Sequence, residues 1–466
     1  MARYDLIIVG MGSAGMVAAE FASTLGIRVA CAERGRIGGD CLWTGCVPSK
    51  ALLASAQAAH TMRHADRYGL TPADPSIDTA RVWDRLRAIQ DEIAATDDDA
   101  ERFRALGVDV LEGGAVLRSG TRVAVGEHEH ETRFVLLATG SRPALPPIDG
   151  LGAAQPLTSE RIFTLDRAPA SVVMIGGGPI SIELAQGLAR LGVKVTVLQR
   201  GPRILTRDEP ALAERLLAGL RAEGVEVITG VQADRVTVRD DGSSKTVHCG
   251  ARSWTAAEIF VGTGRAANVD GLGLEDVGVL AGPDGVIVDG ALRTSVRSVY
   301  AAGDVAGRHH FTHAAGYEAA RALRNMFFPG SSSGEYLVPW CTFTDPELAH
   351  AGLTEAQARA QHGDARVRVW RQDLAHSDRA RTDSAADGEL RIVTAKGRIV
   401  GAHVLAPNAG EVINELALAI DRRLKLTELA NVVHVYPTIA LAIQQLAGEA
   451  AYESARRLSW MVRSRA

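Results

Sequence analysis

The sequence predicts an α/β fold in which two similar parallel-sheet domains precede a smaller α+β domain. An apolar strand, a glycine-rich loop beginning at Gly10, a helix and a second strand follow one another near the N-terminus. The same order returns at Gly176, and the last part of the chain mixes strands and helices without such a loop. Alternation of strands and helices is typical of parallel sheets. We expect a first domain over 1–150, a second over 151–270, a return to the first over 271–335, and a third domain over 336–466.

The composition indicates an ordinary soluble globular protein of several domains. The chain has 466 residues, of which 46% are hydrophobic and 23% charged, and its net charge is −4. This charge offers no electrostatic case for nucleic-acid binding. The first strand, Leu6–Val9, is too short for the apolar region of a signal peptide, and no apolar run is long enough to cross a membrane. Five cysteines without a leader suggest a reducing cytoplasm. We therefore expect a cytoplasmic protein whose partner is a small molecule, with neither nucleic acid nor membrane involved.

The first glycine-rich loop has the G-x-G-x-x-G spacing of a Rossmann-like dinucleotide-binding domain. Gly10 makes the tight turn, Gly12 lets the backbone approach a pyrophosphate, and Gly15 allows close packing of the helix on the strand. The second strand ends at Glu33, where a carboxylate can accept hydrogen bonds from a ribose. Strand, loop, helix and acid together indicate a nucleotide site.

The second loop, Gly176-Gly177-Gly178-Pro179-Ile180-Ser181, departs from this pattern in two ways. Ser181 replaces the third glycine, and the following strand ends in Gln199-Arg200 where an acid would hold a free 2′-hydroxyl. Arg200 and Arg203 suit a 2′-phosphate, which favours NADPH over NADH. The alternative is that both arginines are ordinary surface charges.

Residues 38–50, GGDCLWTGCVPSK, contain two cysteines five positions apart. Helical geometry places residues at this spacing too far apart for a disulfide, so pairing of Cys41 with Cys46 requires a distorted turn, which Gly45 permits. A strained disulfide that closes a short loop is easily reduced, so we interpret the pair as redox-active. Two unpaired buried cysteines, or half of a zinc site, are the alternatives.

The hydrophobic pattern predicts several further elements. We expect helices over 50–57 and 80–106, a buried strand over 134–138 and a linker over 328–334. In the last domain we expect strands over 390–393 and 399–404 and helices over 410–422 and 439–446.

At this point the sequence resembles the FAD-dependent pyridine nucleotide–disulfide oxidoreductases, which include dihydrolipoyl dehydrogenase and mercuric reductase. The resemblance rests on the cysteine motif, both loops, ATGSRP at 138–143, Gly264-Arg265, YAAGD at 300–304 and TFTDPE at 342–347. It implies FAD on the first domain, NAD(P)H on the second, and a homodimer formed through the third. The residues that it implies for the cofactors are Gly10, Gly12, Ser13, Ala14, Gly15, Glu33, Arg34, Gly39, Asp40, Lys50, Ala115, Thr139, Gly140, Ser141, Asp304, Gly176, Gly178, Pro179, Ile180, Gln199, Arg200, Arg203 and Gly264.

The resemblance also implies catalytic roles. Cys46 would be the thiolate next to the flavin, and Cys41 the outer thiol that meets the acceptor. Lys50 would lie near the flavin and pair with Glu183. Asp304 would bind the flavin's ribityl chain.

The chain departs from the family where the acceptor is handled. Disulfide-acting relatives have a histidine directly before Pro-Thr and a glutamate five positions later, whereas this chain has Tyr436 and Leu441. His434 is two positions early and is a candidate for a displaced base. A tyrosine here resembles mercuric reductase, but the tail 456–466 lacks that enzyme's cysteine pair. We expect an oxidoreductase with a mercuric reductase-like core and a small disulfide, soft metal ion or quinone as acceptor. Dihydrolipoyl dehydrogenase and a low-turnover flavin redox sensor are the alternatives.

Two side chains near the motif are further departures. Trp43, between the cysteines, either walls the acceptor site or fills a gap in the core. Pro179 replaces the tyrosine that covers the nicotinamide pocket in glutathione reductase, which suggests more open access to the flavin.

Overall fold

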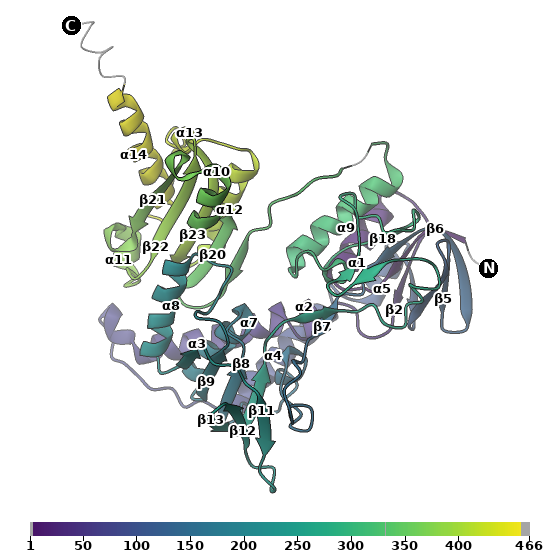
Figure 1. Cartoon of the computed structure of the whole chain (residues 1–466), viewed down its shortest axis with the longest axis horizontal. Helices are drawn as coiled ribbons and strands as arrows, with labels where there is room; N and C mark the ends of the chain where they lie inside the picture. The colour runs from purple at the N-terminus through teal and green to yellow at the C-terminus, as the bar shows by residue number, and fades with distance from the viewer. Residues whose placement is uncertain (1–2, 331, 458–466) are drawn as a thin grey trace, which may run out of the picture.

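A seven-stranded sheet forms the first domain in the computed structural model, which describes residues 3–330 and 332–457. Strands β1, β2, β3, β6 and β18 run parallel, and β4 and β5 continue the sheet antiparallel from β6. Helices α1 and α9 pack together over the parallel part (Figure 1). The elements are β1 (Arg3–Val9), α1 (Ser13–Thr24), β2 (Val29–Glu33), β3 (Asp109–Glu112), β4 (Ala115–Ser119), β5 (Arg122–Val125), β6 (His128–Leu137), β18 (Val299–Ala301) and α9 (Thr312–Phe327).

The second domain has a four-stranded parallel sheet in the order β10-β9-β8-β14. Helix α3 from the first segment of the chain packs against its helix α7, α4 packs against α3, and the indole of Trp83 donates to the carbonyl of Ile162 at 2.9 Å. The helices of the first segment are α2 (Gly39–Trp43), α3 (Cys46–Arg63), α4 (Thr79–Ala94) and α5 (Ala100–Ala105), of which α5 packs against β3 of the first sheet. The elements of the second domain are α6 (Ser159–Ile162), β8 (Ser171–Ile175), α7 (Pro179–Arg190), β9 (Lys194–Gln199), α8 (Pro210–Ala222), β10 (Glu226–Thr229), β11 (Arg235–Val238), β12 (Lys245–Cys249), β13 (Arg252–Ala256) and β14 (Glu258–Val261).

The chain enters and leaves the second domain through paired strands. β7 (Ser141–Pro143) and β15 (Arg265–Ala267) run antiparallel to each other. The chain then forms the short hairpin of β16 (Ala281–Gly282) and β17 (Gly285–Val286), and β18 pairs with β6 of the first sheet. After the second domain the chain thus adds a strand to the sheet formed by its first segment.

The third domain is a five-stranded antiparallel sheet in the order β19-β20-β23-β22-β21. Helices α12 and α14 contribute to its core, and α12 packs against β20 and β23. The elements are β19 (Trp340–Thr342), β20 (Glu347–Gly352), α10 (Glu355–His362), β21 (Val367–Asp373), α11 (Asp378–Thr382), β22 (Glu389–Ala395), β23 (Arg398–Ala406), α12 (Ala409–Asp421), α13 (Leu426–Leu429) and α14 (Leu441–Arg457).

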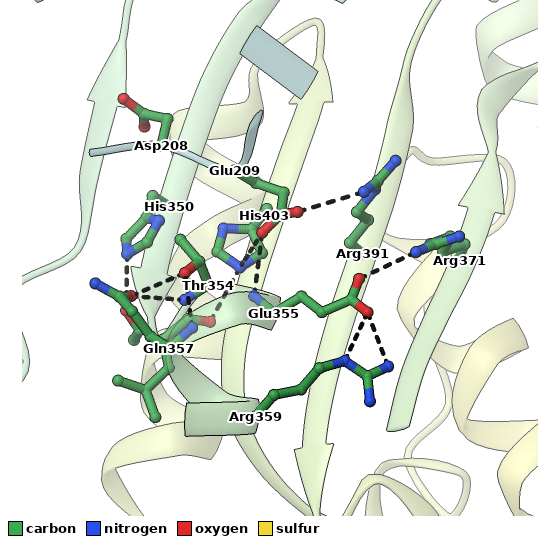
Figure 2. Close-up of polar contacts among 12 residues, drawn as sticks. Asp208, Glu209, His350, Thr354, Glu355, Gln357, Arg359, Arg371, Arg391 and His403 are labelled. Atoms are coloured by element: carbon green, nitrogen blue, oxygen red, sulfur yellow. Dashed lines mark hydrogen bonds and ion pairs between the residues drawn. The ribbon is translucent and has the colours of Figure 1, made fainter. Parts of the chain in front are cut away.

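Helix α8 connects the second domain to this sheet (Figure 1). Figure 2 shows Glu209, which precedes α8, between Arg391 of β22 and His403 of β23. Its carboxylate lies 3.5 Å from the Arg391 guanidinium and accepts the backbone N–H of Glu355 at 3.1 Å. The side chains of Glu209, Arg391 and His403 are buried, so charged groups meet inside the contact between the second and third domains. We call this contact the anchor.

The α/β class is confirmed, but one expected element is wrong. Instead of a single helix over 80–106, α4 ends at Ala94 and α5 begins at Ala100. The Asp99 carboxylate accepts the backbone N–H of Arg102 and thus caps α5, which is a role that short acidic side chains favour. Residues 458–466 of the tail lie outside the part that the structure describes. Within the described part, no helix has both the length and the apolar character that a membrane span requires.

Candidate functional site

The two glycine-rich loops have the same backbone geometry. A Cβ on Gly10, whose φ is +101°, would lie 2.5 Å from the carbonyl oxygen of Ala138, and one on Gly176, with φ +106°, would lie 2.5 Å from that of Gly262. Only glycine fits such turns. Ser181, at the third position of the second loop, is accommodated because Gly262 faces it without a side chain.

The acid at the end of β2 and the amide at the end of β9 occupy matching places. Glu33 Oε2 accepts the backbone N–H of Met11 at 2.7 Å, and Gln199 Oε1 accepts that of Gly177 at 2.9 Å. The second loop therefore keeps the same hydrogen bond between its backbone and the end of the following strand, but the acceptor carries no negative charge.

A cavity of about 1100 Å³ runs from the first loop to the cysteine motif. Most of the residues expected at the flavin or the chemistry line it, namely Gly10, Gly12, Ser13, Ala14, Glu33, Arg34, Gly39, Asp40, Cys41, Cys46, Lys50, Ala115, Thr139, Gly140, Ser141, Pro179, Ile180, Glu183 and Asp304. Gly15 lies behind the loop, where a Cβ would meet the carbonyl oxygen of Gly10 at 1.9 Å. Gly264 is not among the lining residues, but its neighbour Arg265 is.

The lining suits a flavin dinucleotide. The backbones of Gly12 and Gly39 meet so closely that a Cβ on Gly39 would lie 2.8 Å from the Cα of Gly12, which leaves the loop bare toward the cavity. No side chain caps the N-terminus of α1, so its N–H groups are available to a phosphate. Farther along, the Asp304 carboxylate accepts hydrogen bonds from Ser141 and contacts Arg265 at 3.3 Å. Arg265, which the sequence analysis did not single out, also pairs with Asp40.

The cysteines lie on either side of a break between two helices. α2 ends at Trp43 and α3 begins at Cys46, which places Cys46 in the first turn of an 18-residue helix. A Cβ on Gly45 would lie 2.8 Å from the carbonyl oxygen of Asp40, so the break requires glycine. Both cysteines are free thiols in this structure.

The surroundings separate the two thiols chemically. A hydrogen bond from Cys41, with smaller contributions from Lys50 and Thr312, lowers the pKa of Cys46 to about 6 against the opposing effect of burial. The same hydrogen bond and burial raise the pKa of Cys41. Thr312 Oγ1 lies 3.8 Å from Cys46 Sγ. The reduced pair is therefore a thiolate at Cys46 beside a thiol at Cys41.

This difference predicts a pH dependence. Because the pKa of Cys46 lies near 6, its thiolate is present above that pH and is lost as the pH falls through about 6. We expect alkylation of Cys46 by iodoacetamide in the prereduced protein to be half-maximal near pH 6. Lys50→Met should move the midpoint upward, and Lys194→Met, an exposed lysine on β9, should not. The measurement is the rate of carbamidomethylation of the Cys46 peptide by mass spectrometry, and a midpoint near pH 9 would contradict the assignment.

Lys50 and Glu183 come together from α3 and α7. Lys50 Nζ lies 2.8 Å from Glu183 Oε2 and 4.3 Å from the ring centre of Phe343. Glu183 Oε1 accepts the backbone N–H of Phe343 at 2.8 Å. The pair thus joins the cysteine helix, the second domain and the start of the third domain.

Trp43 occupies neither of its two expected places. Its indole donates to the carbonyl of Ile37 at 2.7 Å, and the Arg36 guanidinium lies 3.8 Å from its ring centre. It lines a separate cavity of about 370 Å³ on the far side of the motif, together with Glu33 and Asp98. Trp43 therefore does not wall the space in front of the cysteines.

Several cavity residues were missed from the sequence. Thr312 belongs to the stretch Arg308-His309-His310-Phe311-Thr312-His313, whose three histidines within five positions were the available signal. Cys341 also lines the cavity, and burial raises the pKa of its thiol.

The remaining predicted residues lie elsewhere. Gly176, Gly178, Gln199, Arg200 and Arg203 surround the second loop, away from the cysteine cavity. Arg200 is exposed and has no bonded partner among the described residues, whereas Arg203 donates to the carbonyls of Thr206 and Asp208.

His434 and Tyr436 lie on the third domain. Tyr436 is 66% exposed and donates to Asp378 Oδ2 at 3.0 Å. The side chain of His434 is only 6% exposed and lies 2.9 Å from Glu415 Oε1.

Comparisons with known proteins identify the family. The family model described as pyridine nucleotide-disulphide oxidoreductase matches residues 4–319, and its dimerisation domain matches residues 338–447. Mercuric reductase of Shigella flexneri is 33% identical over 97% of this chain and 82% of its own length. Dihydrolipoyl dehydrogenase of Bacillus subtilis (strain 168) is 32% identical over 96% of this chain and 97% of its own length. The HOCl-induced flavoprotein disulfide reductase RclA from Escherichia coli superposes with a TM-score of 0.83 at 25% identity, covering 96% of this chain and 99% of that one. The chain therefore belongs to the pyridine nucleotide-disulphide oxidoreductases, a family of flavin-dependent enzymes that use a pyridine nucleotide.

Proposed function

We propose that this enzyme oxidises NADPH and passes the electrons through FAD and the Cys41–Cys46 pair to a small acceptor. The observation that carries the proposal is the pair itself, a stabilised thiolate next to a thiol in the cavity that the first glycine loop opens into. FAD would supply the transfer of electrons between the nicotinamide and the sulfur atoms. The first loop with Glu33 and Asp304 would hold it, and Lys50 with Glu183 would orient it.

The acceptor class follows from what faces the cysteines. A low-pKa thiolate and a neighbouring thiol can reduce a disulfide, bind a soft metal ion or add to a quinone. Among the described residues, no cluster of three or more histidine, cysteine or acidic side chains could hold a resident metal. A metal ion would therefore be a substrate at the cysteines, as the name of the mercuric reductase relative suggests.

Steady-state oxidation of NADPH against a panel of acceptors tests this function. The panel contains a dialkyl disulfide, an aryl disulfide, a quinone and Hg(II), and activity toward at least one is the expected result. A flavin that NADPH reduces but that no member of the panel reoxidises would favour a redox sensor instead.

Cofactor choice gives a second prediction. A carboxylate at the end of β9 would repel a 2′-phosphate, and Gln199 removes that charge while it keeps the contact with Gly177. Arg200 is free to bind the phosphate, whereas Arg203 is engaged by its own loop. We expect Arg200→Glu to lower the ratio of kcat/KM for NADPH to that for NADH by about 10–100-fold, the scale of a hydrogen bond to a charged group. Arg203→Gln, the matched control, should change the ratio less. A strong NADH preference in the unmodified enzyme would refute the assignment.

We propose a homodimer as the working form. The third domain matches the dimerisation domain of the family. Its segment before α14 exposes apolar side chains, with Val433 91% and Val435 74% accessible in the single chain. Exposed apolar side chains in a contiguous stretch are typical of an interface. Sedimentation at micromolar concentration should give about twice the mass of one chain.

A further inference from the structure

The acceptor step in the proposed function needs a group that can carry a proton. When a thiol attacks a disulfide, its proton must leave and the departing thiolate must gain one, and a positioned base accelerates such steps by about 10²–10⁴-fold. Relatives that act on thiols place a histidine where this chain has Tyr436.

Neither candidate on the third domain suits this task. Both ring nitrogens of His434 face acceptors, with Nδ1 3.1 Å from the carbonyl oxygen of Val432 and Nε2 2.9 Å from Glu415. Each ring nitrogen is thus directed at an oxygen atom of this chain, and neither is turned toward a substrate thiol. The hydrogen bond from Tyr436 to Asp378 raises the pKa of the tyrosine, which makes its phenolate still rarer at neutral pH.

His313 has the geometry that both of these lack. It follows Thr312, whose hydroxyl contacts Cys46, and it lines the cavity that contains both cysteines. Its Nε2 lies 2.8 Å from the carbonyl oxygen of Pro339, which can only accept, so Nε2 carries the hydrogen and Nδ1 keeps the lone pair. No partner of Nδ1 is present in residues 3–330 and 332–457. The ring of Phe311 stacks on the imidazole at 5.3 Å and holds its orientation.

We propose that His313 of the same chain is the proton carrier for reduction of a disulfide acceptor, an inference that rests on the proposed function. Nδ1 takes the proton of the Cys41 thiol, and the Cys41 sulfur forms a bond to one sulfur of the acceptor as the acceptor's S–S bond breaks. The departing thiolate takes the proton from His313. The Cys46 thiolate then attacks the Cys41 sulfur, which releases the second thiolate and forms the Cys41–Cys46 disulfide. Two electrons leave the cysteine pair, and one disulfide becomes two thiol-level products.

The leaving group provides a test that a merely structural role does not pass. A dialkyl thiolate is a poor leaving group that benefits from protonation, whereas the thiolate of 5,5′-dithiobis(2-nitrobenzoate) leaves readily without it. In the holoenzyme with His313→Gln, glutamine can still donate an N–H to Pro339 but cannot carry a proton. We expect turnover of hydroxyethyl disulfide to fall about 10²-fold. Turnover of the aryl disulfide should fall clearly less, because this substrate loses only the removal of the Cys41 proton and its leaving thiolate needs no proton.

Two matched variants complete the design. His309→Gln changes a histidine that packs edge-on against Tyr336 at 5.3 Å and does not line the cavity. His310→Gln changes another histidine of the cavity wall. His309→Gln should leave the turnover of each disulfide near that of the unmodified enzyme, and His310→Gln shows whether another histidine of the cavity carries the proton instead.

The outcomes separate this inference from the proposed function. Equal loss with both disulfides, no loss with either, or a selective loss in His310→Gln instead overturns the role of His313. Reduction of the flavin by NADPH, followed at 450 nm in a stopped-flow instrument, reports the proposed function alone and should be unchanged in His313→Gln. If the glutamine variant does not fold, His313→Asn takes its place with the same expected pattern.

Discussion

Cys46→Ser is expected to abolish acceptor reduction and to remove the long-wavelength absorption of the two-electron-reduced enzyme. Loss of a nucleophilic group that acts as part of a unit lowers turnover by about 10³-fold or more. The absorption should vanish because a serine hydroxyl does not ionise at neutral pH, whereas the hydrogen bond from Cys41 and the charge of Lys50 lower the pKa of Cys46 and keep a thiolate there.

Cys41→Ser is the matched control. Its hydroxyl can still donate to Cys46, which is the largest cause of the low pKa there, so the thiolate and its absorption band should remain while turnover is lost. Cys41→Ala lacks the donor and should need a higher pH to develop the same band. The measurement is anaerobic titration with dithionite, followed by absorption from 300 to 700 nm. An unchanged reduced spectrum in both serine variants would show that these cysteines are not the redox pair.

Local backbone constraints were what the sequence predicted best. The tight turns at Gly10 and Gly176 exclude every side chain, so their spacing in the sequence already marks both loops. The break at Gly45 has the same origin, because the carbonyl of Asp40 approaches it at a distance that no Cβ tolerates. Such features depend on residues a few positions apart.

Features that depend on distant segments were not predictable in the same way. Thr312 meets Cys46 across 266 positions, and Phe343 meets Glu183 across 160, so no local pattern records either contact. Trp43 was misplaced for a related reason. Its neighbours in the sequence are the cysteines, but the short helix α2 turns its indole toward Ile37 and Arg36. The acidic run before α5 did contain a signal, since Asp99 is a good helix cap, but the hydrophobic pattern alone predicted one helix over 80–106.

The anchor between the second and third domains predicts a large effect on stability. The side chains of Glu209 and Arg391 are 7% and 10% exposed, and Figure 2 shows the Glu209 carboxylate between Arg391 and His403. Removal of one partner of a buried ion pair leaves an uncompensated charge, which costs about 3–5 kcal/mol. Arg391→Met should therefore lower the free energy of unfolding by about 3 kcal/mol or more, measured by urea denaturation of the holoenzyme.

The double variant Glu209→Gln/Arg391→Met shows whether the unpaired charge is the cause. A neutral glutamine oxygen can still accept the N–H of Glu355, and the charge of Glu209 is removed together with that of Arg391. Glu389, the other partner of Arg391, keeps Arg215 at 4.0 Å. We expect the double variant to be more stable than Arg391→Met by at least about 1 kcal/mol, within the range of coupling between contacting residues. If the two are equally unstable, the packing of the Arg391 side chain, and not its charge, holds the domains together.

The same comparison bears on function, because the start of the third domain donates to Glu183 through the backbone N–H of Phe343. Loss of the Glu209–Arg391 contact should therefore also weaken the Lys50–Glu183 pair beside the cysteines. We expect flavin reduction by NADPH to be slower in Arg391→Met and to recover in the double variant.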